Sequence, residues 1–316
     1  VEAGATLRVP RIGRHGLGLV VGYGTSTGVR TNDPKPLYRL REASVALEYR
    51  LQVSPATEVL VRPGYKNVFE ENEIGYETPN NAFVIRSHGY GSLVEGSLAS
   101  MDRRRASSTW EGELAIQRPG GWYVATTASV RTDRVTEALG DPVPDGDYRL
   151  TALSLRATYP IGRVEPSLQL GYGQGRGESY LGSAAGDGGY TYRPVRNVFY
   201  DGRYGDISVE WKPLALRLLH AAGGSISLES NRYEDALAGS LYEYTNAQAD
   251  AYARFSGRSF RGGLRLAYRR NLSGAETVAF PTRLNRTLFL PDYRYHTADA
   301  LLWSLSGRWY CLDRAI

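Results

Sequence analysis

Apolar and polar residues alternate with a period of two along most of the chain. Within residues 43–53, Val45 and Leu47 fall on one face, and Glu48 and Arg50 fall on the other. An extended strand places successive side chains on opposite faces, whereas a helix would scatter these residues around its circumference. The pattern therefore predicts strands with one face in an apolar medium and the other in a polar one.

The same alternation recurs in segments 110–117, 164–172, 260–269 and 299–309. A tilted strand needs about 9 to 11 residues to cross the hydrocarbon layer of a membrane, and these segments have that length. Aromatic residues gather near the segment ends, which is typical of membrane interfaces. They are Trp110, Trp122, Tyr159, Tyr172, Trp211, Tyr268 and Trp309. Soluble barrels and sandwiches also alternate, but the long strands and aromatic ends favour a transmembrane β-barrel.

Short turns and long polar stretches separate the predicted strands in alternation. Turns containing Pro or Gly are predicted at 10–15, 54–57, 118–121, 160–163, 212–214 and 256–259. Long loops are predicted at about 25–38, 69–106, 134–147, 175–203, 230–243 and 272–293. Short turns at one end and long loops at the other indicate an outer-membrane barrel, with the turns periplasmic and the loops extracellular.

The number of strands has two interpretations. Six hairpins and a final strand near 294–310 give about thirteen strands, whereas single-chain bacterial barrels have even numbers. In the first interpretation a strand precedes Val1, and residues are missing before it. In the second, 82–101 forms an additional strand, which gives about fourteen. We expect roughly 12 to 16 strands in a single barrel domain that covers residues 1–316.

Long strands, short turns, long loops and aromatic girdles together resemble the outer-membrane β-barrel proteins of Gram-negative bacteria. The resemblance is one of architecture, extends over nearly the whole chain and brings no catalytic motif with it. It implies an all-β antiparallel barrel in the bacterial outer membrane, in contact with membrane lipid and lipopolysaccharide. The chain departs from such barrels at its end, because they usually finish on an aromatic residue and here 311–316 follow Trp309 and Tyr310.

Composition excludes several other classes. The chain is 42% hydrophobic, and no apolar stretch approaches the roughly 20 residues of a membrane-spanning helix. One cysteine, Cys311, permits no internal disulfide and no metal cluster, and we expect no cofactor. The net charge of +5 comes from dispersed basic residues, so nucleic acid is not an expected partner. The longest basic cluster, 103–105, is interpreted as a solvated surface in preference to a contact with lipopolysaccharide phosphates.

The sequence favours no enzyme. Residues 14–16 match the Arg-His-Gly core of histidine phosphatases, but they stand in a predicted turn and no α/β pattern surrounds them. No spacing between a histidine and a serine or carboxylate indicates a catalytic triad. The four histidines are His15, His88, His220 and His296.

The polar faces of the strands supply the candidate functional residues, which we expect to line the lumen of the barrel. A row of three arginines on one predicted strand would favour anions. The candidates are Arg261, Arg265, Arg269, Arg254, Arg50, Arg62, Glu48, Glu111 and Glu113. In one interpretation these charges line a water-filled pore and set its selectivity, as in porins. In the other, opposite signs pair across the lumen, which the side chains and loops then close.

We therefore expect a porin-like channel or transporter with a charged, arginine-rich lumen. The alternative is a non-enzymatic barrel subunit of an outer-membrane protein complex, with a plugged lumen and a protein partner. An outer-membrane hydrolase is the third hypothesis. A long loop folded into the lumen would distinguish the second from the first. A histidine within hydrogen-bond reach of a serine or carboxylate would favour the third.

Overall fold

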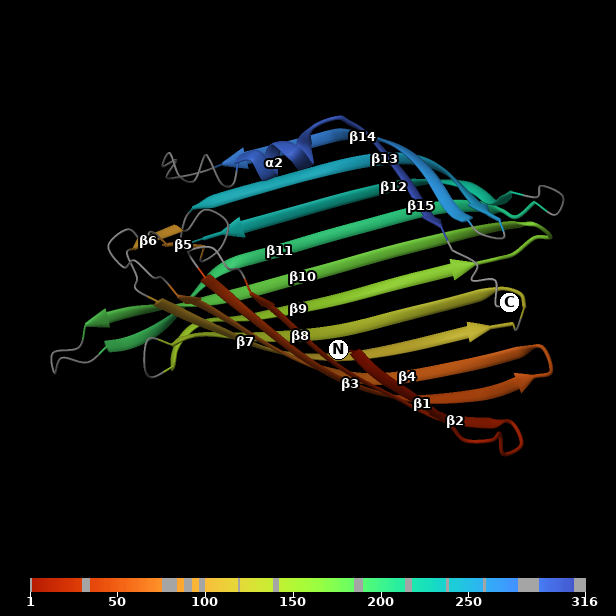
Figure 1. Ribbon diagram of the computed structural model, residues 1–316, viewed down its shortest axis with the longest axis horizontal. Helices are drawn as coiled ribbons and strands as arrows, with labels where there is room; N and C mark the ends of the chain where they lie inside the picture. Colours follow the sequence, from red (N-terminus) through yellow and green to blue (C-terminus); the bar gives the residue numbers. More distant parts are fainter. Residues whose placement is uncertain are drawn as a thin grey trace, which may run out of the picture.

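The structure is a computed structural model that describes residues 2–29, 35–75, 84–87, 93–96, 100–118, 120–138, 142–184, 190–213, 218–236, 239–257, 260–277 and 290–309. In these ranges the chain forms a sheet of thirteen strands, a separate two-stranded sheet and the short helix α2 (Leu290–Thr297) (Figure 1). Within the same ranges, no helix is both long enough and apolar enough to span a membrane.

The strands of the large sheet are antiparallel and follow one another in sequence order, with one interruption. β4 pairs with β7, because β5 (Val84–Ser87) and β6 (Leu93–Gly96) pair with each other instead. The expected thirteen strands are therefore confirmed, and the interpretation of 82–101 as an additional strand of the barrel is wrong. The thirteen are β1 (Glu2–Arg8), β2 (His15–Val29), β3 (Lys35–Ser54), β4 (Thr57–Gly75), β7 (Ser100–Gln117), β8 (Tyr123–Ala138), β9 (Pro142–Thr158), β10 (Val164–Ala184), β11 (Tyr190–Trp211), β12 (Leu219–Asp235), β13 (Ser240–Ser256), β14 (Phe260–Thr277) and β15 (Ala300–Trp309).

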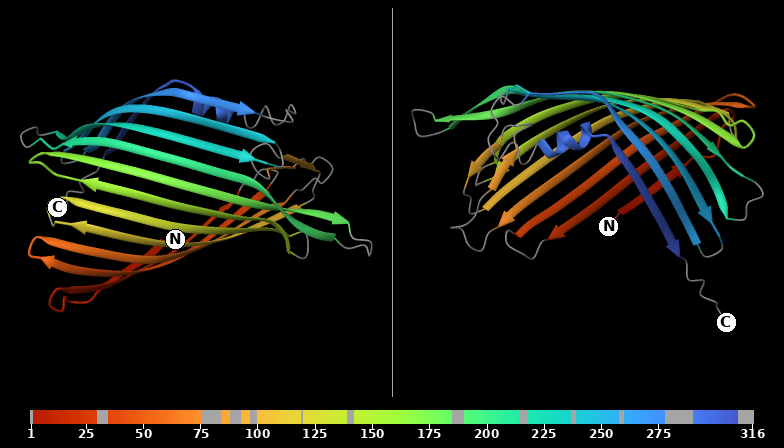
Figure 2. Two further views of the ribbon diagram at one scale, coloured as in Figure 1. Left: turned by 180° about the vertical axis from the view of Figure 1, so that it is seen from behind. Right: turned by 90° about the horizontal axis from the view of Figure 1, so that it is seen from above.

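The sheet is strongly curved and has a convex and a concave face (Figure 2). Helix α2 lies on the concave side, where it contacts Asn246 of β13 and Arg269 of β14. Side chains alternate along a strand, and residues paired across two strands face the same way. Asn246 and Arg269 therefore lie on the concave face. The pairing of the strands then assigns each of the other paired residues to the concave or the convex face.

Large apolar side chains cover the convex face. Leu168, Ile207 and Ile226 lie side by side on three neighbouring strands, and Ile207 and Ile226 are 63% and 69% exposed. A continuous belt of exposed apolar side chains is unfavourable in water but matches the hydrocarbon layer of a membrane. The all-β antiparallel architecture of an outer-membrane β-barrel is thus confirmed.

Exposed aromatic side chains bound the apolar belt at both edges, as the sequence predicts. Trp110, Tyr172 and Tyr268 lie at the edge nearer the longer connections, which we call the loop end. Tyr159 and Trp211 lie at the opposite edge, which we call the turn end. Aromatic rings at these depths match the two interfaces of a bilayer.

The turn end has short connections where the sequence predicts turns. Three of these turns contain a glycine with positive φ, Gly13 at 63°, Gly120 at 73° and Gly162 at 61°. An L residue rarely adopts this conformation, so glycine permits the chain to reverse within a few residues. Parts of the turns at 212–214 and 256–259 lie outside the described residues.

The loop end differs from the sequence-based expectation. The predicted loops at 25–38, 134–147, 175–203 and 230–243 are mostly strand, because β10 and β11, for example, continue to Ala184 and from Tyr190. Beyond the apolar belt both faces of a strand meet water, so the alternation disappears although the backbone pairing continues. The connections after β4 and β14 are the longer ones, and they lie partly outside the described residues.

The two edge strands of the sheet, β1 and β15, run in the same direction, because thirteen strands alternate between them. Over the part of the chain that the structure describes, they are not paired with each other. A barrel closed only by antiparallel pairs needs an even number of strands. A direct junction of β1 with β15 would therefore be parallel.

Leu168 and its neighbour Gln169 test which face meets lipid, because they point in opposite directions on β10. Leu168→Arg places a charge against the hydrocarbon layer and should lower the free energy of unfolding in lipid vesicles by about 2–4 kcal/mol. Gln169→Arg should change it by less than about 1 kcal/mol, since the new charge faces water. Equal losses in denaturant titrations of the two variants would contradict the assignment of the faces.

Candidate functional site

The concave face carries most of the charged side chains of the spanning segments, and the nine predicted lumen residues all lie on it. Arg261, Arg265 and Arg269 alternate along β14 with the outward-facing Leu264 and Leu266. The other six are Arg254 on β13, Glu48 and Arg50 on β3, Arg62 on β4, and Glu111 and Glu113 on β7. Their role in selectivity stays a prediction.

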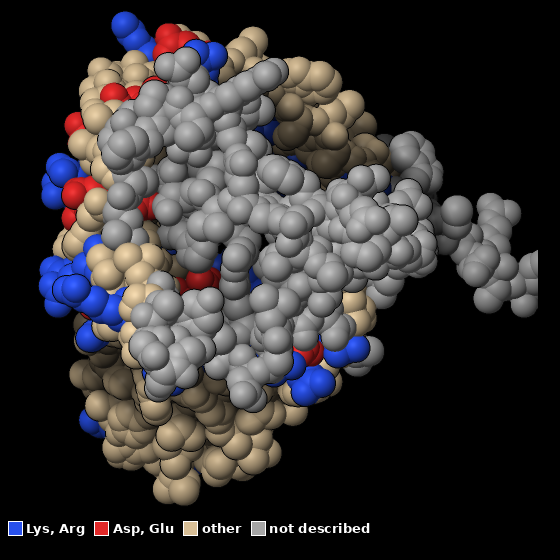
Figure 3. Space-filling view, turned by 90° about the vertical axis from the view of Figure 1, so that its left-hand side faces the viewer, with Lys and Arg blue, Asp and Glu red and all other residues tan. Residues whose placement is uncertain are grey.

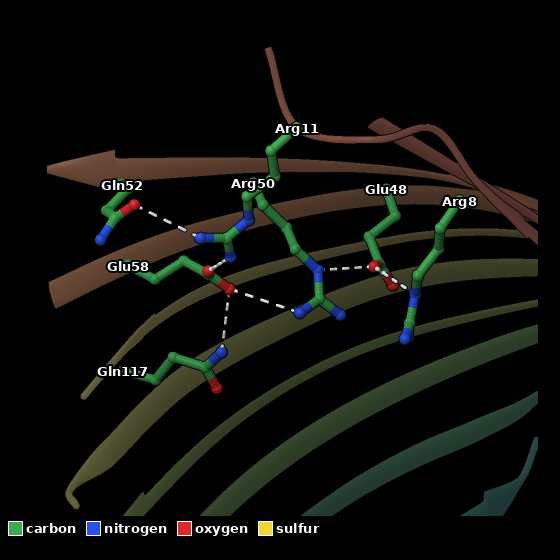
Figure 4. A network of polar contacts seen from close by, with 7 residues as sticks. All are labelled: Arg8, Arg11, Glu48, Arg50, Gln52, Glu58 and Gln117. Atoms are coloured by element: carbon green, nitrogen blue, oxygen red, sulfur yellow. Dashed lines mark hydrogen bonds and ion pairs between the residues drawn. The ribbon is translucent and has the colours of Figure 1, made fainter. Parts of the chain in front are cut away.

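An ion-pair network joins β3, β4 and the first turn near the turn end (Figure 4). The carboxylate of Glu58 is 3% exposed and accepts hydrogen bonds from Arg11 and from Arg50 Nη1, the latter at 3.4 Å. Gln117 Nε2 of β7 donates to the same carboxylate at 3.1 Å. Arg50 Nε also donates to Glu48 Oε1 at 2.6 Å. Shared partners of this kind tie four segments of the chain together through charge-assisted hydrogen bonds.

Glu113 and Glu111 occupy successive inward positions on β7 but have different surroundings. Arg62 Nη2 donates to Glu113 Oε2 at 2.5 Å, and the Tyr123 hydroxyl donates to Glu113 Oε1 at 2.9 Å. Glu111 lies beside Gly64, where an added Cβ would be 3.1 Å from its carboxylate. Among the described residues, Glu111 has no ion pair, so Glu113 is the neutralised member of the two.

Arg265, in the middle of the predicted arginine row, is paired with an acid. Its Nη2 donates to Asp250 Oδ2 of β13 at 2.9 Å, and Ser225 Oγ of β12 donates to the same oxygen at 2.9 Å. An arginine next to a carboxylate contributes little net field to the lumen. The row therefore does not present three equivalent positive charges.

Arg254 and Tyr252 of β13 reach across β12 to Glu210 of β11. Arg254 Nη1 donates to Glu210 Oε2 at 3.1 Å, and the Tyr252 hydroxyl donates to the same oxygen at 2.7 Å. Gly223 of β12 lies between them, and an added Cβ there would be 2.8 Å from the Tyr252 ring. Glycine at this position lets the tyrosine cross the strand.

A cavity of about 1030 Å³ lies against the turn-end half of the concave face, between β11 and β15. The residues that line it include four arginines and two aspartates. Arg261 of β14 and Arg308 of β15 lie directly opposite each other in the register and both line the cavity. Two arginines side by side repel each other and attract an anion between them.

Helix α2 packs on the concave face near the loop end, over β13 and β14. Asn246 Nδ2 donates to the His296 carbonyl oxygen at 2.8 Å, and the His296 ring stacks on Tyr244 with centroids 5.0 Å apart. Arg269 donates to the carbonyl oxygen of Tyr295, and its guanidinium lies 4.7 Å from the centroid of that ring. These contacts hold the helix against the wall of the lumen.

Gly274 of β14 allows the helix to approach closely. An added Cβ at Gly274 would be 3.0 Å from the Tyr293 hydroxyl oxygen and 3.1 Å from Thr297 Cγ2. Burial, with the nearby carboxylates Glu276 and Glu243, raises the pKa of Tyr293 above its ordinary value. The hydroxyl of Tyr293 therefore stays protonated at neutral pH.

The described histidines occupy unrelated places. His15 Nδ1 lies 2.8 Å from the Tyr49 hydroxyl at the turn end, His220 lines the cavity, and His296 belongs to α2. His88 lies outside the described residues. Within the described ranges, no group of three or more His, Cys, Asp or Glu side chains could hold a metal ion.

A family profile described as a family of unknown function (DUF6850) matches residues 5–315. The chain belongs to this family. No curated protein matches it in sequence.

Among solved structures, the chain is similar to the beta domain of the Bordetella autotransporter BrkA, with a TM-score of 0.36 and 10% identity. That match covers 94% of this chain and 99% of the other. It is also similar to OmpT, an outer membrane protein of Vibrio cholerae, with a TM-score of 0.33 and 10% identity, over 94% of this chain and 98% of the other.

Several residues of the site were not among the sequence-based candidates of this DUF6850 chain. Arg308 and Glu210 lie on the polar face of their strands, and alternation with apolar neighbours could have identified them. Residues 290–293 of helix α2 were expected to be loop and 294–297 to begin the final strand, because eight residues carry too little helical periodicity to be recognised. The proline and aspartate in its first turn, Pro291 and Asp292, are the available signal.

Glu58→Gln tests whether the network in Figure 4 stabilises the barrel. Loss of the buried carboxylate leaves Arg50 and Arg11 without their anion, and should lower the free energy of unfolding by about 1–3 kcal/mol. The cost stays below that of a fully buried pair, because the two guanidinium groups are 28% and 47% exposed. Glu111→Gln is the matched control, with an expected change under about 0.5 kcal/mol. Equal denaturation midpoints for the two variants would argue against the network.

Proposed function

We propose that this chain forms a channel in the bacterial outer membrane and passes small anionic solutes along its concave face. The supporting observation is the cavity at the turn end, where arginines outnumber aspartates four to two. A lumen lined by an excess of fixed positive charge concentrates anions and excludes cations of similar size. The proposed function is non-enzymatic.

The location in the outer membrane is supported by the convex face. A belt of exposed apolar side chains, bounded by Trp110 and Tyr172 at one edge and by Tyr159 at the other, matches the thickness and interfaces of a bilayer. Only strands in a hydrogen-bonded sheet, or helices, satisfy their backbone polar groups in hydrocarbon. Barrels of this kind are outer-membrane proteins in Gram-negative bacteria.

The ion pairs of the concave face support selectivity at one place rather than along the whole lumen. Arg62, Arg265 and Arg254 each donate to a carboxylate, so their charges are largely compensated. Arg261 and Arg308 lie directly opposite each other on β14 and β15, and both line the cavity. This pair places two like charges at one point of the cavity wall, so we expect the selectivity of the channel to depend mainly on it.

The second candidate function is a barrel subunit with an obstructed lumen, which serves as the partner of another outer-membrane protein. Helix α2 favours it, because this helix lies on the concave face and covers part of it (Figure 2). A passive channel and an obstructed subunit differ in conductance, which a planar bilayer measures directly.

Single-channel recording of the folded protein in a planar bilayer tests the channel. We expect stable unitary conductance with a reversal potential that indicates anion preference under a salt gradient. The double variant Arg261→Ser/Arg308→Ser should keep its conductance and lose the anion preference, because two adjacent positive charges are removed from the wall of the cavity. Arg270→Ser is the matched control on the same strand, since Arg270 faces outward and is exposed. Absence of conductance in a correctly folded barrel would refute the channel and favour the obstructed subunit.

A second prediction concerns α2. Gly274→Leu places a side chain where Tyr293 and Thr297 now pack, and should displace the helix from β13 and β14. If α2 narrows the passage, the unitary conductance of this variant exceeds that of the wild type. Ser273→Leu adds the same side chain on the convex face one residue away and should leave the conductance unchanged. Equal conductance in the two variants would show that α2 does not narrow the passage.

A further inference from the structure

Arginine side chains project from the convex face just beyond the apolar belt at the loop end. Figure 3 faces this end and shows Lys and Arg interspersed with Asp and Glu at the rim of the molecule. Outward-facing arginines occur here on most of the strands, one or two positions beyond the last apolar residue of the belt. They are Arg41, Arg104, Arg134, Arg149, Arg176, Arg203, Arg232 and Arg270.

Four of these eight arginines, Arg104, Arg134, Arg203 and Arg232, form an ion pair with an acid on the same face. Arg104 Nε lies 3.0 Å from Glu71, Arg134 Nε lies 3.2 Å from Asp147, and Arg203 Nε lies 3.4 Å from Asp201. Such pairs at an exposed rim compensate each other and add little to stability. They account for much of the charge at the loop end without requiring a ligand.

Arg149 of β9 and Arg176 of β10 do not fit this pattern. They lie directly opposite each other in the register, both are exposed, and both point outward. Among the described residues, neither guanidinium has an ion pair. The outward acids around the pair are Asp147, Glu178 and Asp201, which form ion pairs with Arg134, Arg196 and Arg203.

Two like charges directly opposite each other on neighbouring strands destabilise a sheet. The repulsion between Arg149 and Arg176 becomes an attraction when an anion with several oxygens lies between them. Guanidinium groups bind phosphate through pairs of parallel hydrogen bonds, so a single phosphate can take donors from both side chains. An anion would therefore remove an unfavourable contact and form several favourable ones.

The position of the pair relative to the membrane identifies the source of the anion. Leu153 and Tyr172, which lie opposite each other at the edge of the belt, are four residues away from Arg149 and Arg176 along the same strands. Four residues of a strand tilted by about 40° rise roughly 10 Å along the membrane normal. The headgroup layer extends roughly 5–8 Å beyond the hydrocarbon, and an arginine side chain can reach back into it.

We infer that Arg149 and Arg176 form a clamp for the phosphate of a phosphorylated lipid in the outer leaflet, whose acyl chains lie on the apolar belt below. Leu153 and Leu155 on β9, and Leu170 on β10, supply exposed apolar surface beneath the clamp. A free phosphate would bind the same two guanidinium groups, but it has no acyl chains to pack on that apolar surface. The inference rests on the proposed membrane location and not on the proposed channel.

Binding of lipid A to the full, folded chain in detergent tests the clamp, with native mass spectrometry as the measurement. The wild type should bind bis-phosphorylated lipid A, and the double variant Arg149→Ser/Arg176→Ser should bind it about tenfold more weakly or worse. Arg163→Ser is the matched control, because Arg163 is an exposed arginine in the turn at the opposite end. The shift in mobility on heating confirms that each variant is folded.

Three results would overturn the clamp. They are equal lipid A binding by the wild type and the double variant, an equal loss in Arg163→Ser, and displacement of lipid A by inorganic phosphate at the same concentration. Monophosphoryl lipid A that lacks the phosphate bound by Arg149 and Arg176 should bind more weakly than the bis-phosphorylated form. Unitary conductance of the double variant separates this proposal from the channel, because the clamp and the cavity lie on opposite faces. Lipid binding by a wild type that does not conduct refutes the channel alone.

Discussion

The structure depends on continuous hydrogen bonding of the backbone from strand to strand through an apolar layer. No water is available there, so each N–H and C=O of a spanning segment has to pair with a neighbouring strand. That requirement fixes the register, and a slip of one residue would exchange the two faces. The register shifts at Gly177/Glu178 and Val135/Thr136, for example, lie on the loop-end side of the apolar belt.

The concave face follows from the same register. Charged residues at alternate positions on neighbouring strands are brought within reach of one another, and most of them pair across strands. Glu58 and Asp250 each collect donors from more than one strand, which makes the lumen wall stiff and nearly neutral over much of its surface. The same register also places arginines directly opposite each other, at Arg261–Arg308 on the concave face and at Arg149–Arg176 on the convex face.

The apolar segments of the strands, their number and the short turns could be predicted from the sequence, because alternation and turn residues are local signals. The strand extensions at the loop end could not, since both of their faces are polar and nothing local separates them from a loop. Contacts between strands that are not neighbours in the sheet could not be predicted from the sequence either, because they depend on the folded structure. Tyr252 reaches Glu210 across β12 because Gly223 of that strand has no side chain. The orientation of the candidate residues was predictable, and their ion-pair partners were not.

The odd number of strands in the described sheet affects its mechanical strength. Parallel pairs have slanted hydrogen bonds and are slightly weaker per residue than antiparallel ones, and β1 contributes only seven residues to any contact along its free edge. If β1 and β15 meet directly, their junction is the weakest longitudinal joint in the wall. Lateral separation of the barrel would then begin at this joint, and a strand from another polypeptide could bind there in antiparallel orientation to both edges at once.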